Sequence, residues 1–184
     1  MVSATMPECG SATTRLIVLR GNSGPGKSTA AQAVRDRYGR GIAIVGQDNL
    51  RRIILRERDT PGAANIGLID LTARYALDHG FHVIVEGILY AAHYGEMLRQ
   101  LRADHRGTSR FFYFDVSFEE TLHRHATKPQ ANEFGESEMR DWYRSRDVLT
   151  GVDEACIPEV ASLEDTVTRI MREAGLPVRQ TPVS

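Results

Sequence analysis

The stretch Gly21-Asn-Ser-Gly-Pro-Gly-Lys-Ser28 satisfies every fixed position of the pattern G-x-x-x-x-G-K-[ST]. The apolar run 16–19 precedes it and the helix-forming run 29–34 follows it, which is the strand–loop–helix context that the pattern requires. Glycines at three positions let successive backbone N–H groups converge on one anion at the start of a helix. We therefore predict a loop that binds the phosphates of a nucleoside triphosphate, formed by Gly21, Asn22, Ser23, Gly24, Pro25, Gly26, Lys27, Ser28 and Thr29.

Two residues of this loop carry specific chemistry. The ammonium group of Lys27 is expected to reach the β- and γ-phosphates and to act in catalysis, and the Ser28 hydroxyl is expected to bind Mg²⁺. The alternative is a glycine-rich turn followed by a chance Lys-Ser pair. The flanking strand and helix favour the phosphate-binding loop.

Composition narrows the class of protein. With 184 residues, 41% hydrophobic and 26% charged, the chain is typical of a single globular domain. A net charge of −1 gives no general attraction for nucleic acid or for an anionic membrane. No apolar run is as long as a membrane span, and residues 1–14 lack the pattern of a signal peptide. Cys9 and Cys156 read as free thiols in a reducing compartment, so we expect a cytoplasmic protein.

Apolar strands alternate with helical patterns along most of the chain, which predicts an α/β fold with a parallel sheet covered on both faces. The expected strands are 16–19, 42–45, 81–85, 111–114 and a weaker one at 155–157.

Helical patterns lie between these strands. Apolar residues at helical spacing mark helices within 66–77, 97–101 and 163–171. The sequence Ser117-Phe-Glu-Glu120 is a capping box that opens another helix, so Glu120 is a cap residue rather than a catalyst. We predict a single domain over 15–176, flanked by flexible tails at 1–14 and 177–184.

The loop after the second strand contains Asp48 and Arg51, followed by Arg52. In a parallel sheet this loop opens at the same edge as the phosphate-binding loop. Asp48 is then placed to accept a proton from an attacking hydroxyl, and the two arginines to hold an anionic or polyhydroxyl substrate. The alternative is that Asp48 caps a helix over 49–56, which is a favoured use of aspartate.

Glu86 follows the third strand directly. An acidic residue at this position, beside a phosphate-binding loop, is what coordination of Mg²⁺ requires, either directly or through water. The alternative is a capping role, although glutamate is not a favoured cap. The spacing of the six histidines gives no metal site.

Basic residues follow the fourth strand. Arg124 and Lys128 are four residues apart on one helical face and lead into the polar stretch 127–137, which we predict to be a small lid. Arg124 is expected to stabilise charge during phosphoryl transfer, with Lys128 and Arg140 as further lid cations. A solvated basic face is the alternative for each of them.

The order of these motifs resembles the small P-loop kinases. Four features support this resemblance: the phosphate-binding loop, Asp-x-x-Arg after the second strand, the acidic end of the third strand, and the run from Asp115 to Arg124 before a lid. The chain is most similar to the branch of zeta-toxin-like kinases, chloramphenicol phosphotransferase, gluconate kinase and polynucleotide 5′-hydroxyl kinases, over about 15–175. The resemblance implies a three-layer α/β/α P-loop NTPase fold, with five parallel strands in the order 2-3-1-4-5, and Asp48 as general base. Lys128 departs from the family, because many relatives have a second lid arginine there.

These features together predict a kinase that uses ATP and Mg²⁺ to phosphorylate a hydroxyl of a small molecule such as a nucleoside, sugar acid or antibiotic. The sequence lacks the motif Asn-Lys-x-Asp, which recognises guanine, and this favours ATP over GTP as the phosphoryl donor. A polynucleotide 5′-hydroxyl kinase is one alternative, but a nucleic-acid partner calls for a basic track. A regulatory NTPase without an acceptor is the other. We expect no membrane partner, and a monomer or a homodimer.

Overall fold

A computed structural model describes residues 7–24, 26–126, 137, 140 and 143–177 of the chain, with the side chains of 124–126 outside the description. Five strands form one sheet in the order β2-β3-β1-β4-β5, and all neighbouring pairs are parallel. The predicted strand order is confirmed. The strands are β1 (Arg15–Gly21), β2 (Ile42–Gly46), β3 (His82–Glu86), β4 (Thr108–Asp115) and β5 (Glu154–Pro158).

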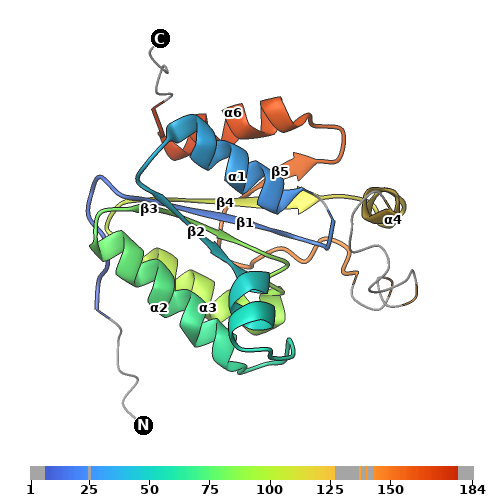
Figure 1. Cartoon of the computed structure of the whole chain (residues 1–184), viewed down its shortest axis with the longest axis horizontal. Coiled ribbons are helices and arrows are strands. Elements are labelled where there is room, and N and C mark those ends of the chain that lie inside the picture. Colours follow the sequence, from blue (N-terminus) through green and yellow to red (C-terminus); the bar gives the residue numbers. More distant parts are fainter. Residues whose placement is uncertain (1–6, 25, 127–136, 138–139, 141–142, 178–184) are drawn as a thin grey trace.

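Helices cover both faces of this sheet, so the molecule has three layers (Figure 1). Helices α1 (Lys27–Tyr38) and α6 (Leu163–Ala174) pack together on one face. Helices α2 (Ala64–Asp78) and α3 (Ala91–Asp104) pack together on the other. A short helix, α4 (Phe118–Ala126), follows β4 at the side of the sheet.

The central strand shows why the sequence gives this arrangement. Successive residues of a strand point to opposite faces, and both faces of β1 are covered. Leu16 and Val18 are therefore buried in the cluster that includes α2 and α3. Ile17 and Leu19 are buried in the cluster that includes α1 and α6. An apolar run without alternation is what a strand buried on both faces requires.

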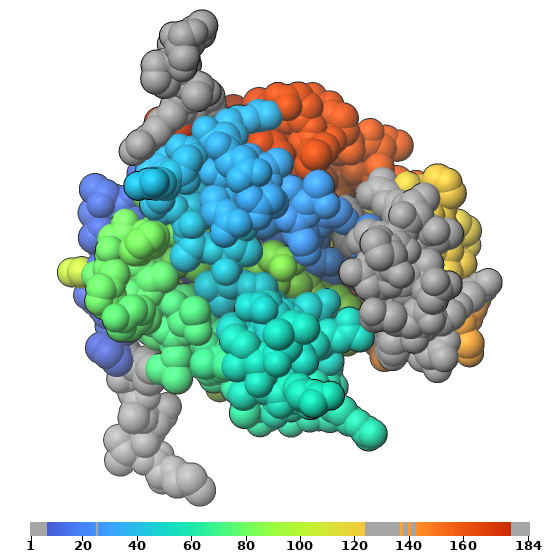
Figure 2. All heavy atoms as spheres, in the orientation of Figure 1, coloured from blue at the N-terminus to red at the C-terminus, as the bar shows by residue number. Residues whose placement is uncertain are grey.

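The topology brings three loops to one edge of the sheet. The phosphate-binding stretch follows β1, Asp48 follows β2, and Glu86 is the last residue of β3. Because the strands are parallel, their carboxyl ends lie at the same edge, and ligands of open α/β sheets bind there. Figure 2 shows α1 and the segment after β2 on the same face of the molecule.

The expectation of a flexible tail over 1–14 is wrong for residues 7–14. Cys9 is 1% exposed and packs in the core. Its N–H donates to the Asp104 carbonyl at 2.9 Å, and its carbonyl accepts from the N–H of Arg106 at 3.1 Å. Burial raises the pKa of the Cys9 thiol to about 11. Residues 1–6 and 178–184 lie outside the described residues.

The helix expected over 49–56 differs in type and length from the one in the structure. The chain forms a π-helix, η1 (Asn49–Ile54), rather than an α-helix. Its wider turns end in Leu55, whose N–H donates to the Leu50 carbonyl at 3.0 Å. Such short π segments occur often at functional sites. No helix in the described part of the chain is long and apolar enough to cross a membrane.

Candidate active site

The phosphate-binding loop joins β1 directly to α1, and two of its glycines are needed for its shape. Gly21 has φ 138°, and a Cβ there would lie 2.6 Å from the carbonyl oxygen of Phe114 on the neighbouring strand. Gly26 has φ 90° and is the N-cap residue of α1, with no side-chain cap among the described residues. An α-helix leaves the N–H groups of its first turn without partners within the helix, so this end of α1 suits an anion.

Lys27 lies inside this loop. It is 6% exposed, and its ammonium donates to the carbonyl oxygens of Gly21 at 2.9 Å and Asn22 at 2.6 Å. The loop thus holds its own cation in place beside the α1 N-terminus. Lysine at this position is the residue that reaches the β- and γ-phosphates in P-loop proteins.

Ser28, in the first turn of α1, contacts Glu86 at the end of β3. The Ser28 hydroxyl donates to Glu86 Oε2 at 2.8 Å. Pairing of β3 with β1 places Glu86 opposite Leu19, two residues before the loop begins. The structure thus brings together the two residues predicted to hold a metal.

Asp48 does not act as the helix cap that was the alternative. Its backbone is already helical, with φ −64° and ψ −36°, and no side-chain cap hydrogen bond is formed to the described residues of η1. Its carboxylate instead accepts from Arg51 Nη2 at 3.0 Å. The Asp48 side chain is 66% exposed, whereas that of Arg51 is 16% exposed. Asp48 therefore presents an oxygen to solvent beside a fixed cation.

A hollow of about 120 Å³ joins these groups. Asp48, Glu86 and the loop thus border the same space, although they lie at the ends of three different strands. Arg52 is exposed on η1 and does not border it. The lining residues are Ser23, Gly24, Gly26, Lys27, Ser28, Thr29, Asp48, Glu86, Gly87 and Ile88.

A buried polar network supports the loop that carries Asp48, and no sequence pattern indicated it. Gln47 is 1% exposed and donates through Nε2 to Tyr94 OH at 2.8 Å and to Asp59 Oδ2 at 3.1 Å. Its Oε1 accepts from the N–H of Leu89 at 3.1 Å. Burial, with the nearby Asp59 charge, raises the pKa of Tyr94. A satisfied network of this kind fixes one backbone path for the residue that follows Gln47.

The predicted lid residues are not all placed. Residues 127–136, including Lys128, lie outside the described residues, and so does the side chain of Arg124. Arg140 is exposed, with its guanidinium carbon 4.4 Å from the ring centroid of Phe118 at the start of α4. The hollow beside the phosphate-binding loop does not include Arg140.

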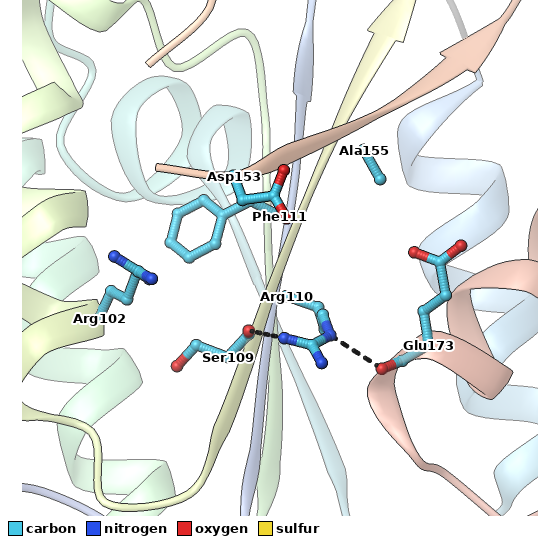
Figure 3. A pocket seen from close by; sticks show the side chains of 7 residues that line it. All are labelled: Arg102, Ser109, Arg110, Phe111, Asp153, Ala155 and Glu173. Carbon is cyan, nitrogen blue, oxygen red and sulfur yellow. Dashed lines mark hydrogen bonds between the residues drawn. The ribbon is translucent and has the colours of Figure 1, made fainter. Parts of the chain in front are cut away.

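A second, larger hollow of about 380 Å³ lies elsewhere, beside the amino-terminal half of β4 (Figure 3). Arg110 spans it, and its Nε donates to the Glu173 carbonyl at 3.0 Å. None of the predicted site residues borders it. The residues that line it are Arg102, Ser109, Arg110, Phe111, Asp153, Ala155 and Glu173.

Comparison with known families agrees with this geometry. A family model described as an AAA domain matches residues 16–150, from β1 to the segment before β5. The chain belongs to this AAA-domain family. A comparison with curated proteins finds no match.

Solved structures similar to this AAA domain include several kinases. The Mycobacterium tuberculosis APS kinase in complex with AMPPNP and APS is 19% identical with TM-score 0.66, over 91% of this chain and 98% of that one. A Sinorhizobium meliloti gluconokinase is 17% identical with TM-score 0.58, over 92% and 96%. The Deinococcus radiodurans tunicamycin resistance protein is 16% identical with TM-score 0.62, over 91% and 99%. At these identities the likeness establishes the fold, and the predicted resemblance to small P-loop kinases is confirmed at that level.

Proposed function

We propose that this protein is a kinase that transfers the γ-phosphoryl group of ATP, with Mg²⁺, to a hydroxyl group of a small molecule. One observation supports this most strongly. Asp48 borders the same hollow as Lys27, Ser28 and Glu86, and its exposed carboxylate does not cap a helix. A nucleotide-binding module without an acceptor has no need of a carboxylate at that position.

The oxygen atoms of this site suit Mg²⁺. Ser28 and Glu86 offer a hydroxyl and a carboxylate oxygen 2.8 Å apart. A hydroxyl and a carboxylate suit Mg²⁺, which commonly takes one or two protein oxygens and completes its shell with phosphates and water. When bound, the ion would neutralise charge on the phosphates.

Residues of the chain orient the triphosphate and accept the proton. The N–H groups at the start of α1 and the Lys27 ammonium orient the triphosphate. Asp48 accepts the proton of the acceptor hydroxyl while that oxygen bonds to the γ-phosphorus and the bond to the bridging oxygen breaks. ADP leaves with the electron pair. A base in this role contributes about 10²–10⁴-fold, and positioning supplies much of the rest.

An assay with γ-labelled ATP separates the possible functions. The protein is incubated with Mg²⁺ and three groups of acceptors: small hydroxy compounds, a 5′-hydroxyl oligonucleotide, and water alone. We expect label on a small molecule. Label on the oligonucleotide would indicate a polynucleotide kinase instead, and label released only as free phosphate would indicate an NTPase without an acceptor.

A further inference from the structure

The hollow beside β4 exists because two neighbouring strands begin at different levels. Strand β4 begins at Thr108, whereas β5 pairs with it only from Phe111 onward, where Phe111 lies opposite Glu154. The first three residues of β4 therefore have β1 on one side and no described strand on the other. The gap opens between α3 and α6, which contribute Arg102 and Glu173 to its two sides (Figure 3).

A second hollow adjoins the first at this end of β4. Its volume is about 420 Å³, and that of the first is about 380 Å³. Arg102, Ser109 and Arg110 border both hollows. Asp153 and Glu173 border the first, whereas the described residues that line the second include no carboxylate. Two arginines thus border a space large enough for a small ligand.

Backbone contacts hold the Arg110 guanidinium across the first hollow (Figure 3). Its Nε donates to the Glu173 carbonyl at 3.0 Å, and its Nη1 donates to the Ser109 carbonyl at 3.3 Å. Both acceptors are neutral, so these contacts fix the guanidinium without balancing its charge. They use two of the five N–H donors of an arginine. The remaining donors are already held in place, which favours binding of an anion because little order is lost.

Arg102 brings a second positive charge to the same space. It is an exposed residue in the last turn of α3. Within the described part of the chain its side chain forms no hydrogen bond and no ion pair. The helix dipole favours a basic residue at this end of a helix. That role leaves all the N–H donors of Arg102 available to a ligand.

The two carboxylates of the first hollow differ in how far they offset this charge. Glu173 Oε1 accepts from Arg169 Nε at 2.8 Å and lies 3.7 Å from Arg172 Nη2, so its charge is balanced within α6. Asp153 is exposed and has no ion pair with a residue that the structure describes. One unbalanced carboxylate therefore borders the hollow together with two unbalanced guanidinium groups, which leaves an excess of positive charge.

We propose that Arg102 and Arg110 form a binding site for a phosphate group, separate from the active site. A phosphate monoester carries close to two negative charges at neutral pH, which matches two guanidinium groups. Its oxygens point in several directions, so arginines from two elements can each donate a pair of hydrogen bonds. A planar carboxylate suits only one such fork.

The surroundings of the two arginines allow a larger phosphorylated compound as well as free phosphate. Phe111 and Ala155 also line the first hollow and offer apolar surface to a carbon skeleton. The site lies toward the amino-terminal end of β4, whereas Lys27 and Asp48 lie at the carboxyl ends of the strands. It therefore goes beyond the proposed function and does not depend on it.

Calorimetric titration of the full chain tests the site with two probes, inorganic phosphate and phenyl phosphate. The protein is first saturated with Mg²⁺ and AMPPNP to occupy the phosphate-binding loop, and chloride holds the ionic strength constant. We expect saturable binding that is about tenfold weaker in Arg102→Gln and in Arg110→Gln. Asp153→Asn is expected to bind phosphate about two- to threefold more tightly, because a repelling charge is removed. Tighter binding of phenyl phosphate would indicate a phosphorylated compound as the ligand, and equal binding would indicate free phosphate.

Arg172→Gln is the matched control, because Arg172 is an arginine of α6 whose side chain is 73% exposed and borders neither hollow. Arg110→Gln also removes contacts of the fold, so urea unfolding checks its stability. Arg102→Gln removes no such contact among the described residues and decides the test if Arg110→Gln is unstable.

Three results would overturn the phosphate site: no saturable binding of either probe, equal weakening by Arg172→Gln and Arg102→Gln, or weaker binding in Asp153→Asn. The Arg102 and Asp153 variants identify the site whether or not AMPPNP binds. A protein that fails to bind AMPPNP would therefore contradict the proposed function and leave this test intact.

Discussion

At the scale of single residues, the proposed Mg²⁺ site consists of Ser28 and Glu86. One hydrogen bond of 2.8 Å holds the Ser28 hydroxyl and a Glu86 carboxylate oxygen together. A carboxylate there attracts Mg²⁺ through its charge, whereas an amide offers only a neutral oxygen. Glutamine has the same length and its amide oxygen can accept the same hydrogen bond from Ser28. Glu86→Gln therefore tests charge without removing the contact.

We expect Glu86→Gln to weaken binding of Mg²⁺–ATP about tenfold or more, while binding of ATP in the presence of a chelator changes little. Titration calorimetry under both conditions measures the difference, with Glu96→Gln, an exposed residue of α3, as control. An equal loss with and without Mg²⁺ would mean that Glu86 acts on the loop itself rather than on a metal.

At the scale of elements, Arg20 ties the central strand to the segments that follow the predicted lid. It is fully buried in β1, donates through Nη2 to Asp147 at 2.9 Å, and pairs through Nη1 with Glu154 of β5 at 3.0 Å. The Glu154 side chain is 3% exposed and also accepts from the N–H of Leu149 at 2.6 Å. A buried charge with one partner removed is strongly destabilising.

Glu154→Gln is accordingly expected to lower the free energy of unfolding by about 3 kcal/mol. Urea unfolding measures this, and Asp153→Asn at the adjacent exposed position is expected to stay within about 0.5 kcal/mol of the parent. Equal, small effects of both substitutions would show that Arg20 is satisfied by its remaining acceptors.

The elements also show where sequence patterns were sufficient. All five strands were predicted: the apolar runs of the first four leave a direct signal, whereas β5, with only Ile157 buried, gave a weaker one. The phosphate-binding loop is a local motif. The π-helix at η1 was not, since its apolar spacing over a few residues does not distinguish it from an α-helix. The contact between Asn22 and Arg144 joins residues 122 positions apart, so no local pattern reveals it. A charged Arg20 at the end of an apolar strand was the one available signal of the network around it.

At the scale of the whole molecule, a buried histidine couples stability to pH. His105 is 6% exposed, and its ring nitrogens lie 2.9 Å from the hydroxyls of Thr14 and Ser109. Burial, with a smaller effect of the Arg15 charge, lowers its pKa to about 4. The unfolded chain takes up this proton near the ordinary value of about 6.5, whereas the native protein does so only near 4.

The unfolded state therefore binds more protons between these two values, and the native state loses stability as pH falls from about 6.5 to about 4. This histidine accounts for at most about 3 kcal/mol of that loss. We expect His105→Gln to be less stable than the parent at pH 7.5 by more than at pH 4.5 in urea unfolding. A stability difference that is the same at both pH values would contradict the assignment, since carboxylates titrate alike in both proteins.

The account as a whole depends on phosphoryl transfer with Asp48 as the base, and Asp48→Asn tests it most directly. Asparagine keeps the size of the side chain and can still accept a hydrogen bond from Arg51, but it cannot take a proton from a hydroxyl. The measurement is single-turnover transfer of labelled phosphoryl from ATP to the acceptor found in the panel assay, together with the dissociation constant for Mg²⁺–ATP. We predict unchanged nucleotide affinity and a transfer rate lower by about 10²-fold or more, with Asp36→Asn on α1 as control. Transfer by Asp48→Asn at close to the parent rate would contradict the account.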